Sequence, residues 1–227
     1  MKNLIKTSII LSLLSVTTLY GQDRITKEEK YQKINDLKTI VKYDPLRLLT
    51  GEIAFSVERK TGLNTSFEIE FGPTISEVRP FNSDHLGVGQ STSTRSNIGG
   101  FASIGYRFYP AKGAFRGIYI SPKFKYKLVN TTYVAPYGTT SDFIGDKSQG
   151  TFMFNFGIQT WATSNFSFDF YTGLGLGFAN KNYAYQTSVY DNQTNTNIYS
   201  WVRKSDTYST LVFNLGVKIG IGFEGKN

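Results

Sequence analysis

Along most of the chain, apolar and polar side chains alternate one by one, in segments of about ten residues. Successive side chains of a β-strand point to opposite faces, so this alternation predicts strands with one apolar face and one polar or small face. In 152–159, for example, Phe152, Phe154, Phe156 and Ile158 alternate with Met153, Asn155, Gly157 and Gln159. Seven segments show the pattern plainly: 49–57, 66–72, 98–108, 118–128, 152–159, 166–178 and 211–223.

The lengths of the connections predict an eighth strand. Short links lie near 59–62, 110–115 and 162–165, and long polar ones run through about 76–96, 130–149 and 179–206. In outer-membrane barrels short turns face the periplasm, long loops face outside, and the number of strands in a single bacterial chain is even. We therefore predict a further upward strand at 35–44 and a tight outer turn around Asp44-Pro45. The predicted fold is all-β, an eight-stranded antiparallel up-and-down transmembrane β-barrel.

The N-terminus resembles a secretory signal. Lys2 and Lys6 precede an apolar stretch, Ile9 to Tyr20, which ends at the small residue Gly21. This stretch is shorter than the roughly 18 to 20 residues that a transmembrane helix needs. We expect residues 1–21 to be a signal peptide, 22–34 a charged lead-in and 35–227 the barrel, located in the cell outer membrane.

Composition narrows the function classes. The chain has no cysteine, which excludes disulfides and thiolate metal sites. Aromatic residues make up 15% and there are 22 glycines, a bias that favours β-structure. Loss of residues 1–21 would remove two lysines and no acid and so reduce the net charge of +8 by two. For an exported chain this basic balance points to outer-membrane lipid and lipopolysaccharide as partners, and not to nucleic acid.

Two prolines oppose the barrel prediction, because proline cannot donate to a strand ladder and a closed barrel has no edge strand. Pro73 would lie near a rim, whereas Pro122 falls inside a predicted strand and requires a bulge. A soluble β-sandwich is the alternative architecture. It would explain neither inward lysines nor outward phenylalanines.

Charged residues occupy the polar faces of several predicted strands. The lumen of an eight-stranded barrel is filled by side chains, so near-balanced charges there predict ion pairs. Glu68 and Glu70 should lie at about the height of Lys123 and Lys125. The predicted lumen charge network comprises Glu52, Glu68, Glu70, Arg107, Lys123, Lys125, Lys127, Asp169 and Lys218. By the same pattern Lys38, Lys42 and Glu58 should also face inward.

These charges leave two interpretations of the lumen open: a plug of structural ion pairs, or a narrow pore for small solutes or ions. A third possibility is a lipid-modifying enzyme, whose site would need a histidine base near a serine and a carboxylate. The single histidine, His85, lies beside Ser83 and Asp84 in the first long loop, where solvation is its ordinary role. No catalytic, cofactor or metal motif stands out. The glycines of GLGLG at 173–177 lie in a strand and should give inward room to Tyr119, Tyr171 or Trp161.

Two segments carry a resemblance to a known family. "YDPLRLLTGEIAFSVERK" and "GYRFYPAKGAFRGIYISPKFKYK" resemble small outer-membrane β-barrel proteins of unknown function from Gram-negative bacteria, related to the OmpA-type eight-stranded barrel. The resemblance covers most of the chain after residue 21. It implies a barrel and no catalytic motif. The last strand also looks like a recognition signal for the barrel-assembly machinery, with Asn214, Gly216, Ile219, Ile221 and Phe223.

The sequence thus predicts an integral outer-membrane barrel of structural or interaction type, with three long extracellular loops around a plugged lumen. Outer loops rich in Thr, Ser, Asn and Tyr could bind a surface partner, because loops on a rigid scaffold often carry function.

Overall fold

The computed structural model describes residues 27–75, 94–111, 113–135, 141–193 and 195–225. Its elements, in chain order, are α2 (Lys27–Asp36), β1 (Leu37–Asp44), the 3-10 helix η1 (Pro45–Thr50), β2 (Ala54–Lys60), β3 (Thr65–Thr74), β4 (Thr94–Phe108), β5 (Gly117–Tyr133), β6 (Phe143–Trp161), β7 (Phe166–Asp191) and β8 (Thr196–Glu224). The expected signal peptide and His85 lie outside the described residues.

The eight strands form one closed antiparallel ring in chain order, β1 to β8, and β8 pairs back to β1. The predicted all-β class and ring of eight strands are therefore confirmed. Closure leaves each strand with two partners over the height of the ring, which satisfies its backbone N–H and C=O groups. Among the described residues, no helix is both long and apolar enough to cross a membrane.

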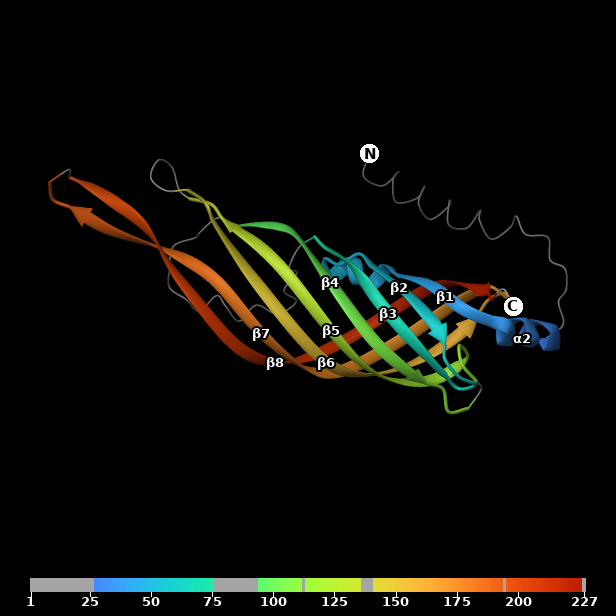
Figure 1. Cartoon of the computed structure of the whole chain (residues 1–227). Helices are drawn as coiled ribbons and strands as arrows, with labels where there is room; N and C mark the ends of the chain where they lie inside the picture. Colours follow the sequence, from blue (N-terminus) through green and yellow to red (C-terminus); the bar gives the residue numbers. More distant parts are fainter. Residues whose placement is uncertain (1–26, 76–93, 112, 136–140, 194, 226–227) are drawn as a thin grey trace, which may run out of the picture.

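The two ends of the ring differ (Figure 1). One end, here called the turn end, carries the short links 61–64, 109–116 and 162–165, with α2 and the end of β8 close by. At the opposite end β7 and β8 run far beyond the other strands. Lys60 Nζ donates to the carbonyl of Asn35 over 2.9 Å, and Ile34 is fully buried, so α2 packs against the turn end.

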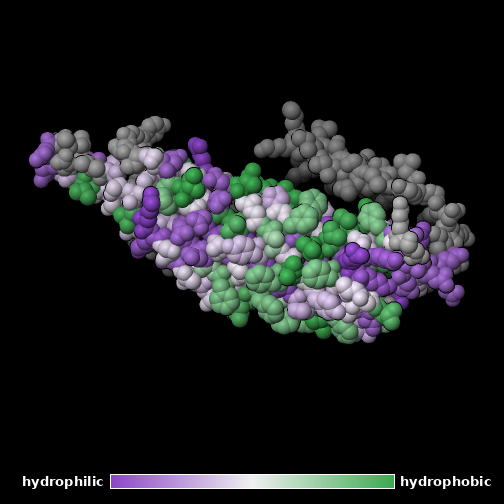
Figure 2. Space-filling model, in the orientation of Figure 1, coloured by the Kyte–Doolittle hydropathy of each residue, from purple (hydrophilic) through white to green (hydrophobic). Residues whose placement is uncertain are grey.

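The polarity of the ring is inverted relative to a soluble domain. Large apolar side chains such as Phe154, 49% exposed, cover the outside, while charged side chains such as Arg107, 2% exposed, lie inside. Among the described residues, more polar and charged side chains are buried than apolar ones. Figure 2 shows hydrophobic side chains over the wall of the ring and more hydrophilic surface toward its ends. A soluble core selects the reverse arrangement.

Two of the three predicted long loops are mostly strand, so this part of the prediction is wrong. β5 and β6 continue in register to Tyr133↔Phe143, and β7 and β8 continue to Asp191↔Thr196. Most described side chains of these extensions are exposed or half-buried, although Ala179 and Ala184 are buried, so their sequence need not alternate strictly between apolar and polar residues. Cross-strand pairs and the backbone ladder hold them instead. Residues 76–93, within the first predicted long loop, lie outside the described residues.

The start of the chain's second strand is also corrected. The segment predicted as strand from Leu49 is the end of η1 and a turn, and β2 begins only at Ala54. Asp44 caps η1, because its side chain accepts a hydrogen bond from Leu46 N, and Pro45 stands at the first helical position. Gly51 ends η1 with a φ of 74°, a left-handed conformation that suits glycine.

A bulge at the start of β1 overturns the inward placement of Lys38. The register between β1 and β8 shifts between Leu37 and Thr39, and Lys38 is exposed while Leu37 is buried. An extra residue in one strand reverses the face of those before it. The inward placement of Lys42 holds, since Lys42 is 1% exposed.

Pro122 is accommodated without the predicted bulge. The ladder between β5 and β6 continues through Pro122↔Phe154, and the register between β4 and β5 is the same on either side of the proline. The β4–β5 pairing is interrupted between Ile120 and Lys123, so a gap of two residues in one ladder absorbs the missing N–H. The register shift between these two strands lies elsewhere, between Asn97 and Gly100.

Two glycines make space for lumen tyrosines. A Cβ at Gly157 would lie 2.4 Å from Tyr119 Cζ, and one at Gly216 would lie 2.3 Å from Tyr171 Cζ. The glycines of 173–177, which the sequence suggested for this purpose, face other residues of β6 and β8. Each tyrosine ring therefore lies against a glycine of an adjacent strand.

Candidate functional site

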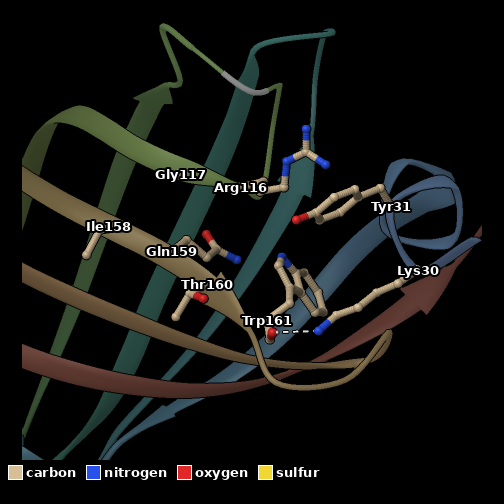
Figure 3. Close-up of a pocket in the computed structure, with 8 residues that line it drawn as sticks. All are labelled: Lys30, Tyr31, Arg116, Gly117, Ile158, Gln159, Thr160 and Trp161. Atoms are coloured by element: carbon tan, nitrogen blue, oxygen red, sulfur yellow. Dashed lines mark hydrogen bonds between the residues drawn. The ribbon is translucent and has the colours of Figure 1, made fainter. Parts of the chain in front are cut away.

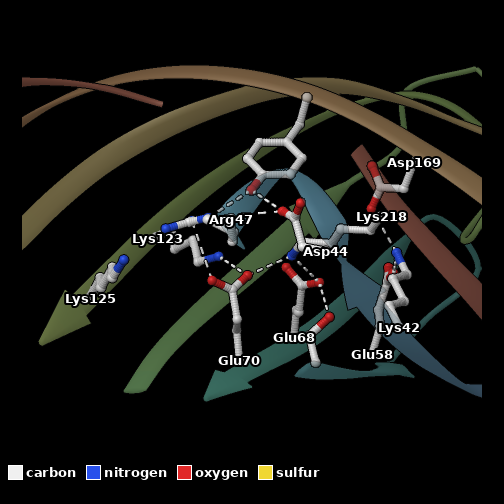
Figure 4. A network of polar contacts seen from close by, with 12 residues as sticks. Lys42, Asp44, Arg47, Glu58, Glu68, Glu70, Lys123, Lys125, Asp169 and Lys218 are labelled. Carbon is white, nitrogen blue, oxygen red and sulfur yellow. Dashed lines mark hydrogen bonds and ion pairs between the residues drawn. The ribbon is translucent and has the colours of Figure 1, made fainter. Parts of the chain in front are cut away.

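The lumen holds one continuous network of buried ion pairs, drawn in part in Figure 4. Nearest the turn end, Lys42 pairs with Glu58 and, over 2.8 Å, with Asp169. Arg107 contacts Asp169 at 2.6 Å and Glu68 at 2.7 Å. Each carboxylate here thus has at least one cationic partner within hydrogen-bond distance.

Two tyrosines complete this part of the network. The Tyr119 hydroxyl donates to Asp169 Oδ1 over 2.6 Å, and the Tyr109 hydroxyl contacts Glu58 Oε1 at 2.7 Å. The Arg107 guanidinium also lies over the Tyr119 ring, 4.3 Å from its centroid. Buried charges need such additional hydrogen bonds to offset the loss of water.

The middle of the lumen is linked to this group through Glu68. Lys218 contacts Glu68 and Glu70, each at 2.7 Å, and Lys123 contacts Glu70 at 2.7 Å. Glu70 is in turn 3.3 Å from Arg47, which connects the middle of the lumen to the part farthest from the turn end, here called the outer part.

The outer part is built around Glu52, between η1 and β2. Arg47, Lys125 and Lys127 approach its carboxylate at 2.8, 2.7 and 2.9 Å. Behind Arg47, the Tyr171 hydroxyl donates to Asp44 over 2.6 Å. The 3-10 helix therefore folds a cation over the lumen.

Several of these contacts cross the lumen. Arg107 of β4 reaches Asp169 of β7, and Lys218 of β8 reaches Glu70 of β3. Neither pair of strands is adjacent in the ring. The ion pairs consequently tie opposite walls together and fill the space between them.

All nine residues of the predicted charge network face the lumen and take part in ion pairs. The predicted pairing by height holds for Glu70 with Lys123, whereas Lys125 contacts Glu52. The difference arises because Glu52 precedes β2 at the outer rim, closer to the far end of β5.

Sequence reasoning missed Arg47 and Asp44 as lumen residues. Asp44 was assigned to the end of the predicted strand 35–44 and to the tight turn with Pro45, and Arg47 fell between that turn and the strand predicted from Leu49, so neither received an inward place. A signal was available: Asp followed directly by Pro is typical of an N-cap and first helical position.

Three lumen carboxylates, Glu58, Glu68 and Asp169, offer oxygens within 4.8 Å of one another. Such a group could hold a metal ion if it were otherwise uncompensated. Here Lys42 and Arg107 already supply the positive charge. We therefore assign the group to the ion-pair network.

A separate pocket lies at the turn end, between α2 and the ends of β5 and β6 (Figure 3). Its volume is about 320 Å³. The lining residues are Lys30, Tyr31, Arg116, Gly117, Ile158, Gln159, Thr160 and Trp161. Sequence reasoning missed this site because it assigned no role to the lead-in that forms α2.

Comparisons of the chain with protein-family models, curated proteins and solved structures find no match. The family resemblance seen in the sequence therefore stays a prediction, and function must be argued from the geometry.

Proposed function

We propose that this chain is an integral outer-membrane β-barrel of structural or interaction type, with a lumen that does not conduct. The observation that carries the proposal is the inverted polarity of the ring: apolar side chains outside and ion-paired charges inside. An exterior of this kind is unfavourable in water and favourable in lipid.

The height of the apolar exterior supports the membrane proposal. On β5 the outward apolar side chains run from Ile118 to Leu128, which are 60% and 44% exposed. Ten residue steps of about 3.3 Å span roughly 33 Å along the strand, or about 23 Å at a tilt near 45°. That value is close to the roughly 25 Å apolar band of outer-membrane barrels.

The ion pairs that cross the lumen support a plug over the narrow-pore alternative. A conducting path would need water and mobile ions along the axis, where Arg107 and Lys218 now join opposite walls. Removing one partner of such a pair would leave an uncompensated charge, which keeps the pairs closed. The lipid-modifying alternative rests on His85, outside the described residues, and no geometry favours it.

The extension of β7 and β8 supports an interaction role. Beyond Asn182↔Ser205 the ladder continues without β6, so residues 183–204, here called the ribbon, form a two-stranded hairpin whose backbones pair only with each other. Nine residues per strand project about 30 Å. On the proposed orientation the ribbon lies outside the cell, where lipopolysaccharide and surface partners occur, and β8 supplies the strand that the assembly machinery would recognise.

The membrane proposal is tested by placing an arginine in the apolar exterior. Phe154→Arg puts a charge near the middle of the band, so we expect a loss of about 2 to 4 kcal/mol in the free energy of unfolding. Ser148→Arg is the matched control: it lies on the same strand and the same face, six residues toward the rim, where the cost falls to about 0 to 1 kcal/mol. Urea unfolding of protein refolded in phospholipid vesicles measures both.

Equal effects of the two arginines would contradict a bilayer around the ring. So would recovery of the full-length protein, expressed in Gram-negative cells, in the soluble fraction instead of the outer membrane.

The interaction role is tested in the same cells. A photo-crosslinking amino acid at Val189, 64% exposed in the ribbon, should give a discrete adduct with a protein or glycan. The same group at Ile118, on the apolar exterior, should give only lipid adducts. Absence of any adduct from Val189 and from neighbouring ribbon positions would contradict the role.

A further inference from the structure

The turn-end pocket contains two buried N–H donors that have no partner. Gln159 is 1% exposed, and its Nε2 makes no hydrogen bond. Arg116 is half-buried, but its Nε atom is buried and makes no hydrogen bond either. Figure 3 shows the Gln159 amide nitrogen turned toward the space between Arg116, Tyr31 and Trp161. Buried donors in native proteins are nearly always satisfied, so two in one pocket indicate a missing acceptor.

The orientation of the Gln159 amide follows from its other side. Its Oε1 lies 2.7 Å from the Tyr109 hydroxyl and 3.3 Å from Lys42 Nζ, an ammonium group that can only donate. The oxygen therefore belongs on the lumen side, and the NH₂ group faces the pocket.

Two cations face the same space and are held by neutral groups. Lys30 Nζ donates to the carbonyl oxygens of Trp161 and Ala162, over 2.9 and 3.0 Å. The Arg116 guanidinium lies over the Tyr31 ring, 4.3 Å from its centroid. Neither contact neutralises the positive charge, so the pocket attracts an anion.

The walls beside these donors are aromatic. Trp161 is buried and fixed by the hydrogen bond from its Nε1 to Phe115 O, 2.7 Å long, and Tyr31 stands opposite on α2. A volume of about 320 Å³ is at the lower end of ligand pockets. The site therefore suits a compact molecule with a small apolar body and one anionic group.

We propose that this pocket binds a carboxylate of a small peptide, with one oxygen on Gln159 Nε2, the charge facing Lys30 and Arg116, and the apolar part against Trp161 and Tyr31. The planar, two-oxygen carboxylate can accept from both unpartnered donors at once. The proposed carboxylate binding follows from the pocket residues and does not depend on the membrane proposal. On that proposal the turn end faces the periplasm, where carboxylate-bearing peptides are either free or attached to the cell wall.

The chain offers an intrinsic reporter, because its two tryptophans are Trp161 in the pocket and Trp201 in the ribbon. In a Trp201→Phe background, full-length protein in detergent micelles is titrated with N-acetyl-alanyl-alanine. We expect a saturable change in Trp161 fluorescence. The same dipeptide with its C-terminus amidated should bind at least tenfold more weakly.

Substitutions separate the pocket from general charge effects. Arg116→Gln, and Lys30→Gln with Arg116→Gln, should each weaken binding at least tenfold. Lys33→Gln is the matched control, since it removes a cation from the same helix outside the pocket and should leave binding unchanged. Arg116→Gln alone keeps the test decisive if loss of the Lys30 contacts loosens α2.

The source of the carboxylate is distinguished by sedimentation with insoluble cell-wall sacculi. Co-sedimentation that the free dipeptide abolishes indicates a cell-wall peptide, and dipeptide binding without co-sedimentation indicates a free one. No saturable response, an equal response to the amidated dipeptide or to inorganic phosphate, or full binding by Arg116→Gln would overturn the proposal.

Discussion

Arg107 shows how much a single residue contributes to the lumen. It contacts Glu68 and Asp169 within 2.7 Å and is 2% exposed. Arg107→Met removes the charge and keeps much of the volume, so the buried carboxylates of Glu58, Glu68 and Asp169 keep only Lys42 and Lys218 as cationic partners. We expect the free energy of unfolding to fall by about 3 to 5 kcal/mol, measured by urea unfolding in detergent micelles.

Two further variants serve as a control and a comparison for Arg107→Met. Arg95→Met, at the exposed outer start of β4, should change stability by less than about 0.5 kcal/mol. Arg107→Lys retains the charge and loses the forked geometry that reaches two carboxylates, so it should fall between them. A loss under 1 kcal/mol for Arg107→Met would mean that the buried pairs contribute little.

Gly216 tests the packing of the lumen without changing any charge. A Cβ at Gly216 would lie 2.3 Å from Tyr171 Cζ, whereas a Cβ at Gly150 would lie 3.7 Å from Phe124, an ordinary contact. Gly216→Ala should therefore cost about 1 to 3 kcal/mol by overpacking. Gly150→Ala serves as control in the same urea titration, and an equal cost for both would show that Tyr171 moves aside freely.

At this scale the sequence predicted inward charges well, because a strand's alternation gives each residue a face directly. It did not predict which charges meet. Lys125 pairs with Glu52, and Arg47 joins them from a turn, because these contacts depend on strand stagger and on η1, which alternation does not encode. Lys38 was misplaced by one bulge.

Among the elements, the ribbon is the one whose length the sequence did not show. Side chains at its base contact neighbouring segments: Tyr183 donates to Asp206 of β8 over 2.9 Å, which raises the pKa of Tyr183, and Trp201 Nε1 donates over 2.9 Å to the carbonyl of Ser141, just before β6. Polar and aromatic residues on both faces read as loop by pattern, although the backbone ladder is continuous. The short links predicted near 59–62, 110–115 and 162–165, by contrast, lie within about two residues of the links in the structure, because the alternation stops where each strand ends.

The ribbon should be separable from the ring. Replacing residues 183–204 by Asn-Gly joins the directly paired Asn182 and Ser205 through a two-residue hairpin turn. We expect the urea midpoint and the heat-dependent migration in SDS gels to match those of the wild type, because no pairing of the ring is removed. An Ala substitution of Tyr190 alone, at an exposed ribbon position, controls for surface changes.

Failure of the shortened chain to fold would show that the ribbon contributes to the stability of the ring. Its role would then extend beyond presenting a surface.

For the whole molecule, the ion-pair network predicts a lumen without ion conductance. Wild-type protein in planar bilayers should add no recurrent single-channel steps, because opposite walls are joined by ion pairs along the lumen. Cleavage of the ribbon by protease added on one side verifies insertion. Steps of constant amplitude that persist in repurified protein would support the narrow-pore alternative instead.

The strand pairings of the ring differ in the length of chain that each one closes. β1 pairs with β2 and with β8 over about the same short height, but its partners in β2 lie within about 20 residues, whereas those in β8 are about 180 residues away. Closing a loop some ten times longer costs roughly 2 kcal/mol more in chain entropy. We therefore expect the pairing of β1 with β8 to form last during assembly. The order of the strands along the chain thus sets the place at which the ring closes on itself.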